Sequence, residues 1–310
     1  MNKIFFLGEC MVELRAIDDN TMEQSFAGDV YNSAVYLQRC FPGIKAGMVT
    51  AVGTDALSEK MIQKFHHESL DTTFVFQHKD KVPGLYLIKT DAVGERSFTY
   101  WRSDAAARFL MDFLSDDVAG LFKTGDALFI SGISLAVITP AARSALWSLL
   151  EQLKSRGVTL IFDPNYRARL WSSTDEAITA FQRAFQLADI ALPGVEDLEV
   201  LFGISNAEAA IEYCQSFGIR EIVVKNGPES VLTYANGQLQ KHPITPVTKV
   251  VDTTSAGDAF NGVYLGARIQ NRSISDAVQL AATAAGTVIQ HPGAIAPAAA
   301  FRAAMVTAGI

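Results

Sequence analysis

The chain has 310 residues, of which 49% are hydrophobic and 19% are charged, and its formal net charge is −7. This composition supplies a large core and excludes an intrinsically disordered chain. The acidic balance, with no dense run of Lys and Arg, also excludes a nucleic-acid-binding surface, which needs clustered positive charge to neutralise phosphates.

The N-terminal segment carries an apolar run of only four residues, Ile4 to Leu7, which is too short for a signal peptide. No apolar stretch approaches the roughly 20 residues that a membrane-spanning helix requires. The three cysteines, Cys10, Cys40 and Cys214, match neither a metal-binding spacing nor a disulfide framework. The sequence therefore predicts a cytoplasmic protein that has free thiols and does not bind a membrane.

Short apolar runs alternate with segments of helical periodicity through most of the chain. The runs predict buried parallel strands, and the helical segments between them predict βαβ units. This alternation indicates an α/β fold, a three-layer sandwich with a mainly parallel central sheet, as a single domain over residues 1–310. The predicted strands are Ile4 to Leu7, Ala127 to Ile130, Thr159 to Phe162, Ile190 to Leu192 and Glu221 to Lys225, and the predicted helices cover 141–155, 174–187, 206–217 and 294–308.

The stretch from 72 to 102 departs from this alternation. Thr72 to Gln77, Gly84 to Thr90 and Arg96 to Trp101 each predict a strand, and turn-prone segments separate them. Extended pieces without intervening helices indicate a small β-structure, which together with residues near 10–28 would form a lid that excludes water from a cleft. The alternative is an ordinary extension of the main sheet.

The stretch 250–266 passes from an apolar strand end through small residues into a helical pattern. Small residues let backbone N–H groups approach an anion, and the N-terminus of the following helix adds positive potential. The amides of Ser255, Ala256 and Gly257 are therefore predicted to bind phosphoryl oxygens, and Asp258 to take a proton from an attacking hydroxyl. The alternative is a structural helix N-cap preceded by a glycine turn.

The run from Asp252 to Asp258, Asp-Thr-Thr-Ser-Ala-Gly-Asp, resembles the C-terminal signature of the ribokinase-like (PfkB-type) carbohydrate kinases. Phe26 to Asn32 resembles the sugar-binding segment of that family, Val52 to Asp55 its Gly-x-Asp turn, and Val223 to Gly227 its nucleotide-side strand and loop. The resemblance covers essentially the full chain. It implies the ribokinase-like fold, ATP and Mg²⁺ as cofactors, a small-molecule sugar as substrate, and a homo-oligomer, by default a dimer paired through the lid.

Two further segments resemble the 2-keto-3-deoxygluconate kinases within this family. They are Asp163 to Trp171, and Pro83 to Tyr86 followed by Arg96 to Arg102. The similarity implies a sugar-acid kinase that phosphorylates the 6-hydroxyl of 2-keto-3-deoxygluconate. Each segment also has a purely structural interpretation, as a strand with packed aromatic residues or as a strand-ending turn.

A sugar acid carries a carboxylate, and a guanidinium group pairs with a carboxylate through two parallel hydrogen bonds. Arg102 and Arg167 are the candidates for this contact. By the resemblance, Tyr86 and Tyr100 hold the sugar acid together with Arg102, and Arg167 reaches the sugar, the phosphates or both.

The sugar hydroxyls are expected at Gly28, Asp29 and Asn32, because glycine admits close approach to the backbone and the two polar side chains can bond hydroxyls. The same residues predict a turn and N-cap that open a helix from Ser33 to Arg39, and both roles are compatible. Ala27 stands where the family has its first glycine.

The resemblance implies that the nucleotide is bound by Asn165, Arg167, Lys225, Gly227 and Ser230. Ser255 and Gly257 would contact its phosphates as well. Residues 291–294 would close the adenine pocket.

The segment Leu192 to Asp197 departs from the family, because Gly194 stands where many members have an Asn that helps to position Mg²⁺. No direct metal ligand is therefore assigned, and Glu196 and Asp197 are candidates for contact through water. A monovalent cation such as K⁺ near Asp252 and Thr254 is a further expectation from the resemblance.

Two alternatives to the sugar-acid kinase stay open from the sequence. One keeps the kinase fold but changes the acceptor to a neutral sugar or a nucleoside, and the other is a non-catalytic sugar or nucleotide sensor on the same scaffold. A dehydrogenase is disfavoured, because no Gly-x-Gly-x-x-Gly follows the first strand. The gluconate and galactonate epimers of the acceptor are not distinguished.

Overall fold

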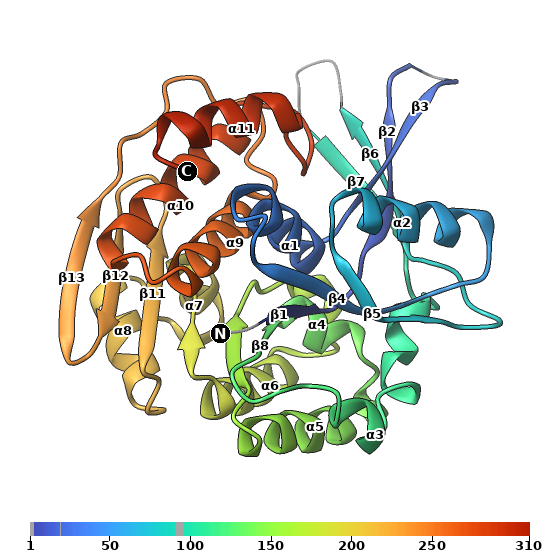
Figure 1. The fold of residues 1–310 in the computed structure, drawn as a ribbon, viewed down its shortest axis with the longest axis horizontal. Helices are drawn as coiled ribbons and strands as arrows, with labels where there is room; N and C mark the ends of the chain where they lie inside the picture. The colour runs from blue at the N-terminus through green and yellow to red at the C-terminus, as the bar shows by residue number, and fades with distance from the viewer. Residues whose placement is uncertain (1–2, 19, 91–95) are drawn as a thin grey trace.

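The computed structural model describes residues 3–18, 20–90 and 96–310. Within these residues a central sheet of nine strands crosses the molecule in the order β13-β12-β11-β10-β9-β8-β1-β4-β5 (Figure 1). The strands from β11 to β5 in this order pair in parallel, and β12 and β13 extend one edge in the antiparallel sense. The strands of this sheet are β1 (Lys3–Leu7), β4 (Lys45–Val52), β5 (Asp71–Gln77), β8 (Ala127–Ser131), β9 (Thr159–Asp163), β10 (Ile190–Ala191), β11 (Glu221–Asn226), β12 (Ser230–Ala235) and β13 (Gln238–Pro243).

Helices cover both faces of the central sheet, so the predicted three-layer α/β fold is confirmed (Figure 1). One apolar core lies between the sheet and the first layer of helices, and a second core lies under the other layer. The first layer consists of α1 (Asp29–Cys40), α2 (Ala56–His67), α9 (Ala256–Ile269), α10 (Ile274–Val288) and α11 (Ala298–Thr307). The second consists of α3 (Asp116–Ala119), α4 (Gly132–Val137), α5 (Arg143–Ser155), α6 (Thr174–Leu187), α7 (Val195–Phe202) and α8 (Ala207–Gln215). Three short 3₁₀ helices are η1 (Ala106–Asp112), η2 (Pro140–Ala142) and η3 (Ala168–Leu170).

Helix α6 illustrates how local sequence signals set these elements. The side chain of Ser173 accepts a hydrogen bond from the Glu176 amide at 3.1 Å and so caps the helix. Its buried residues recur every three or four positions, and Phe181 and Phe185 both pack edge-on against Phe162 of β9. The helix therefore starts at its cap and buries one apolar stripe on the sheet.

Most predicted elements are confirmed within one or two residues, but α1 and α11 have different starts. Helix α1 begins at Asp29 and not at Ser33, so the residues expected in the turn lie in its first turn. Helix α11 begins at Ala298 and not at residue 294, because Pro297 occupies its N-cap position and the preceding residues form a loop.

A smaller sheet projects beyond the edge of the central one, with the order β3-β2-β6-β7 (Figure 1). The segment 72–77, predicted as part of the lid, differs from that prediction: it belongs to β5 and pairs in parallel with β4 in the central sheet. Phe74 explains this placement, because it is buried against Phe5 and Phe122 in the core. Residues 19 and 91–95 of the predicted lid lie outside the described residues. The strands of the small sheet are β2 (Met11–Ala16), β3 (Met22–Ala27), β6 (Leu85–Thr90) and β7 (Arg96–Trp101).

Two expectations about the whole chain can be compared with the fold. Cys10, Cys40 and Cys214 are all buried and free, as predicted. In the described part of the chain, no helix combines the length and apolar character that crossing a bilayer requires.

Candidate active site

The candidate site lies where parallel strands of the central sheet end at their carboxyl termini. Glu9 follows β1, Asp163 ends β9, and Lys225 lies one residue before the end of β11. The N-termini of α1 and α9 meet at the same edge, as the bond between Asn32 and Asp258 shows. In open α/β sheets this edge is where ligands bind, because loops and helix N-termini converge there.

The N-terminus of α9 is shaped for an anion. Ser255 occupies the N-cap position with φ of 65° in the left-handed region, and its side chain makes no capping hydrogen bond to the helix. The first amides of a helix have no acceptor within the helix, so those of Gly257 and Asp258 stay available to a ligand. The Ala256 amide has only a long contact, 3.4 Å, to the Thr253 carbonyl.

Asp258, the third residue of α9, is held by a residue from the other end of the chain. The Asn32 side-chain amide donates to its Oδ2 at 2.9 Å, and the Gly28 amide donates to Asn32 Oδ1 at 3.3 Å. A Cβ on Gly28 would lie 2.3 Å from the carbonyl oxygen of Glu9, so only glycine fits at this approach. The turn that was predicted to bind sugar thus positions the predicted base.

The electrostatics of the site raise the pKa of Asp258 to about 7. Burial is the main cause, and the negative charge of Asp29 is the second; the hydrogen bond from Asn32 opposes both. A carboxylate with such a pKa suits a general base near neutral pH.

Asp29 itself accepts a hydrogen bond from the Asn165 side chain at 2.9 Å. Burial raises the pKa of Asp29, while hydrogen bonds from Ser131 and Asn165 lower it. Asn165 was predicted on the nucleotide side, but its side-chain amide contacts the first turn of α1, where the sugar was expected. Its φ of 33° lies in a region that asparagine tolerates better than most residues.

Lys225 forms a buried polar cluster with two residues that the sequence did not single out individually. Its ammonium donates to Asp163 Oδ2 at 3.0 Å and to Asn261 Oδ1 at 3.2 Å, and Asn261 donates to Asp163 Oδ2 at 2.6 Å. The Lys225 ammonium would lie 3.8 Å from a Cβ built on Gly257, so its charge adjoins the uncapped helix. The available signal was spacing, because Asn261 lies three residues after Asp258 and therefore on the same face of α9.

Arg102 is engaged by an acid in the protein, which the sequence did not reveal. Its guanidinium donates to Glu9, which is only 2% exposed. Burial raises the pKa of Glu9, and the positive charges of Arg102 and Arg108 oppose that rise. A Cβ on Gly84 would lie 2.3 Å from Glu9 Oε1, so the glycine makes room for this ion pair.

An aromatic wall lines the small sheet beside Arg102. The rings of Tyr86 and Tyr100 are stacked with centroids 5.7 Å apart, and the Tyr86 hydroxyl donates to Glu13. The guanidinium of Arg169, from η3 in the main body, lies 5.4 Å from the centroid of the Tyr100 ring. Glu13 and Arg169 are thus further polar residues at this wall that sequence reasoning missed.

Three residues that were predicted to bind the nucleotide do not contact these clusters. Arg167 is exposed and donates to the carbonyl of its neighbour Tyr166 at 2.8 Å. Gly227 is exposed in the turn between β11 and β12, whereas Ser230 is buried at the start of β12. Their nucleotide-binding roles stay predictions.

The two metal candidates on α7 differ in their surroundings. Glu196 is exposed, whereas Asp197 is half-buried and accepts the Tyr166 amide at 2.9 Å. Burial, and then the negative charge of Asp163, raise the pKa of Asp197 to about 6. Among the described residues, no group of three His, Cys, Asp or Glu side chains is arranged to hold a metal ion.

The loop over residues 291–294 connects the two sides of the site. Asp252 accepts the Thr254 amide at 2.8 Å and the Gly293 amide at 2.9 Å, which ties this loop to the start of the segment before α9. Ala294 packs in a small apolar cluster with Tyr86 of the small sheet. A loop expected at the adenine pocket therefore also touches the wall expected at the sugar.

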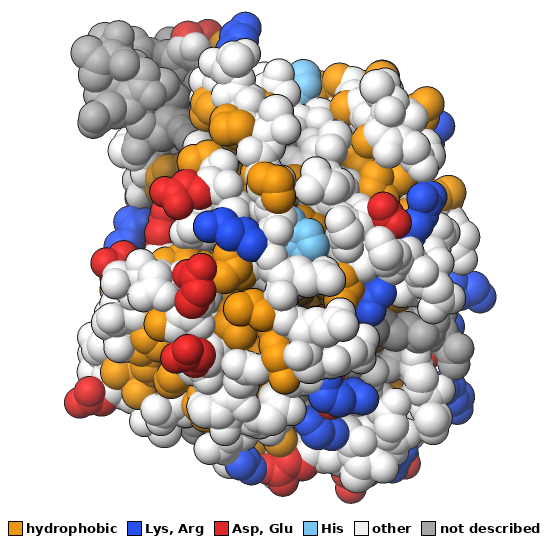
Figure 2. Space-filling view, turned by 90° about the vertical axis from the view of Figure 1, so that its left-hand side faces the viewer, with side chains coloured by type: hydrophobic (Ala, Val, Ile, Leu, Met, Phe, Trp, Pro, Cys, Tyr) orange, Lys and Arg blue, Asp and Glu red, His pale blue; other side chains and the backbone are white. Residues whose placement is uncertain are grey.

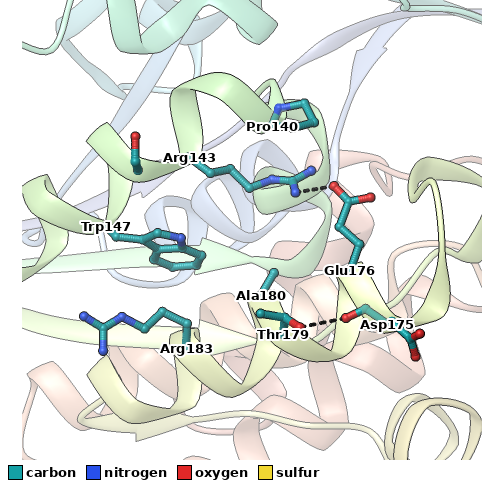
Figure 3. A pocket seen from close by; sticks show the side chains of 9 residues that line it. Pro140, Arg143, Trp147, Asp175, Glu176, Thr179, Ala180 and Arg183 are labelled. Carbon is teal, nitrogen blue, oxygen red and sulfur yellow. Dashed lines mark hydrogen bonds and ion pairs between the residues drawn. The ribbon is translucent and has the colours of Figure 1, made fainter.

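Two other surfaces of the protein do not bring together polar and charged groups in the way that the strand ends do. A hollow of about 640 Å³ lies between α5 and α6, and its Arg143 pairs with Glu176 (Figure 3). The other arginine of this hollow, Arg183, pairs with Glu151. The face on the side of β13 mixes acidic and basic side chains with apolar ones (Figure 2). Neither resembles the concentration of carboxylates, Lys225 and helix amides at the strand ends.

Comparisons with known proteins identify this α/β chain, with its polar residues gathered at the strand ends, as a carbohydrate kinase. The sequence description of the pfkB family carbohydrate kinases matches residues 1–300. The chain belongs to this family. It is 39% identical over 303 residues to a 2-dehydro-3-deoxygluconokinase of Escherichia coli K12, which covers 95% of this chain and 97% of that protein.

Solved structures support the fold. A fructokinase from Vibrio cholerae O395 in a fructose, ADP and calcium ion bound form is 26% identical with a TM-score of 0.83, covering 98% of this chain and 99% of that one. An aminoimidazole riboside kinase from Salmonella enterica, complexed with aminoimidazole riboside and an ATP analogue, is 23% identical with a TM-score of 0.84 and covers 99% of both chains. The predicted ribokinase-like fold is confirmed.

Proposed function

We propose that this chain transfers the γ-phosphoryl group of ATP to the 6-hydroxyl of 2-keto-3-deoxygluconate, a sugar acid also named 2-dehydro-3-deoxygluconate. The observation that carries the proposal is the position of Asp258. Asn32 holds its carboxylate at 2.9 Å, and the residue lies in the uncapped first turn of α9. This arrangement puts a proton acceptor beside free amide donors, which is what phosphoryl transfer to a hydroxyl requires.

In the proposed step, Asp258 takes the proton of the 6-hydroxyl. The hydroxyl oxygen forms a bond to the γ-phosphorus while the bond from that phosphorus to the β,γ-bridging oxygen breaks, and ADP carries away the bonding pair. A base with a pKa of about 7 is largely ionised just above neutral pH and still accepts a proton readily. The amides of Ser255, Ala256 and Gly257 would stabilise the charge on the transferring phosphoryl oxygens.

The phosphate side fits a triphosphate tail bound with Mg²⁺. Lys225 brings a positive charge next to Gly257, and the N-terminus of α9 adds its positive potential. When bound, Mg²⁺ would neutralise phosphate charge while it keeps several waters. Asp197 is the better of the two candidates to contact that hydrated ion, because it is half-buried beside Asp163 and Lys225.

The sugar acid is supported by the small sheet and by the relative of 39% identity that is named for this acceptor. Arg102, although paired with Glu9, retains guanidinium N–H groups for a carboxylate, and Tyr86 and Tyr100 form the wall beside it. Fixing the carboxylate end of the substrate would orient its terminal hydroxyl toward Asp258 for in-line attack.

The second candidate function keeps the chemistry but uses a neutral acceptor. The likeness to a fructokinase structure at 26% identity favours it over a non-catalytic sensor. A coupled assay of ADP release distinguishes the sugar-acid kinase, the neutral-sugar kinase and the sensor. The acceptors to compare are 2-keto-3-deoxygluconate, its galactonate epimer, gluconate, fructose and ribose. The proposal expects the highest kcat/KM with a 2-keto-3-deoxy sugar acid. A preference for fructose or ribose would overturn the acceptor, and no turnover with any sugar would favour a sensor.

The small sheet is also proposed as a lid and as a dimer contact. Exposed apolar side chains occur on or beside it, namely Ile17, Met22, Val82 and Trp101. Such a set suits pairing with a second copy of the chain. Light scattering tests the pairing: we expect a dimer for the wild type and a monomer for Trp101→Glu. A wild-type protein with the mass of a monomer would reject the proposed dimer.

A further inference from the structure

One loop spans the whole candidate site, from the phosphate side to the small sheet. It starts at Asp163, which bonds Lys225 and Asn261. Asn165 then donates to Asp29 in the first turn of α1. Four residues later, the Arg169 guanidinium lies over the ring of Tyr100 in β7. Arg169 is therefore a side chain of the main body that contacts the small sheet at its aromatic wall.

The charge of Arg102 is already offset within the protein. Glu9, the acid that accepts its hydrogen bond, is buried, and the Arg102 side chain is 12% exposed. An incoming carboxylate would meet a pair whose net charge is close to zero. A buried ion pair of this kind gives a weak field for a second anion, because its two charges largely cancel at a distance.

Arg169 has the opposite character. Within the part of the chain that the structure describes, no carboxylate pairs with it, and its contact is the face of Tyr100 at 5.4 Å. An aromatic ring attracts a guanidinium without neutralising its charge, and it leaves the N–H groups in the guanidinium plane free. The stack of Tyr100 on Tyr86 fixes the ring, so this charge is held beside the wall that Arg102 adjoins.

We propose that Arg169 determines the preference for an acidic sugar: its guanidinium, held on the Tyr100 ring, pairs with the substrate carboxylate. This assignment rests on the proposed function. Arg102 then contributes hydrogen bonds from its pair with Glu9, and Arg169 contributes a positive charge that no carboxylate among the described residues offsets. A neutral sugar gains nothing from that charge, so Arg169 separates acidic from neutral acceptors.

The test measures steady-state kinetics of the full-length enzyme with 2-keto-3-deoxygluconate and with its neutral methyl ester. Arg169→Gln is expected to raise KM for the acid by about 10- to 100-fold, the range for losing a hydrogen-bonded charge pair. KM for the ester and KM for ATP are expected to change less than about twofold, since neither of them depends on the carboxylate contact. Arg169→Lys keeps the charge and is expected to recover part of the loss.

The matched control is Arg183→Gln, which is expected to leave all these constants unchanged. Arg183 lies on α6 (Figure 3) and pairs with Glu151, far from the candidate site. If Arg169→Gln changes the acid and the ester equally, Arg169 only tethers the small sheet, and the assignment fails. The assignment also fails if KM for the acid does not change. A wild-type enzyme that does not phosphorylate the acid overturns the proposed function itself, which is a separate result.

Discussion

The side-chain amide of Asn32 donates a hydrogen bond of 2.9 Å to Oδ2 of Asp258, across 226 positions of sequence. This bond joins the first turn of α1 to the first turn of α9 and fixes one oxygen of the proposed base. It leaves the other oxygen for a substrate hydroxyl. The bond thereby links a turn near the N-terminus of the chain to a turn near its C-terminus.

Replacing Asp258 with Asn should lower kcat by about 10³-fold, the usual contribution of a positioned general base. The same change should stabilise the protein at pH 8. The folded-state pKa of about 7 lies above the ordinary value of 3.8, so the folded state loses stability relative to the unfolded chain as the pH rises between these values. We expect a gain of about 4 kcal/mol for the variant at pH 8 and almost none near pH 4. Urea unfolding at both values checks this, and equal stability at pH 8 contradicts it.

The acid limb of kcat/KM should have an apparent pKa near 7, because this constant reports the base of the free enzyme. Asp29→Asn removes a negative charge that raises the pKa of Asp258. The acid limb should therefore move to lower pH, by about one pH unit, even though sugar binding weakens. Rates from pH 5 to 9 measure the shift, and an unchanged limb would separate Asp29 from the titration of the base.

The packing of α1 on α9 depends on Gly262, where a Cβ would lie 2.1 Å from the carbonyl oxygen of Ser33. Gly262→Ala should cost about 1–3 kcal/mol of unfolding free energy, because backbone on both sides must move. It should also lower kcat by about 100-fold, since Asn32 and Asp258 lose their register.

Gly286→Ala in α10 is the control for this packing. Its Cβ would lie 3.1 Å from the Val247 side chain, in a loop that can adjust. The expected change in stability is within about 1 kcal/mol. Similar losses in both variants would mean that the α1–α9 contact has no special role.

Lys225→Met should leave the buried carboxylate of Asp163 without its cation and cost about 3 kcal/mol of stability. It should also reduce kcat by about 100-fold, because the positive charge beside Gly257 is lost. The double variant Lys225→Met with Asp163→Asn separates the two effects. It should recover most of the stability and none of the turnover; recovery of both would make Lys225 purely structural.

Asp197→Asn should raise the Mg²⁺ concentration that gives half-maximal velocity several-fold. The reason is the loss of about 1 kcal/mol of interaction with the ion through water. The Asn side chain can still accept the Tyr166 amide, so the fold should be retained. Glu196→Gln is the matched control on the same helix turn, and its exposed side chain predicts a change below about twofold. A larger effect from Glu196→Gln would reverse the assignment.

Much of the fold could be read from the sequence because its signals are local. Ile4 to Leu7 is a continuous apolar run and forms most of β1, an interior strand of the sheet, as expected for a parallel strand buried on both faces. The apolar spacing of residues 174–187 predicted the bounds of α6 without tertiary information. The segment 72–77 was different, because a strand pattern does not say which sheet the strand joins.

The sequence alone determined the α/β architecture, the small residues around Asp258 and the family to which they point, because each depends on neighbours within a few positions. Tertiary structure decided that Glu9 engages Arg102, that Asn165 turns toward Asp29, and that Arg169 reaches Tyr100. These partners lie from 69 to 136 positions apart. Charge pairing and burial act through space, so the state of each charged group is set only when the strands and helices have packed.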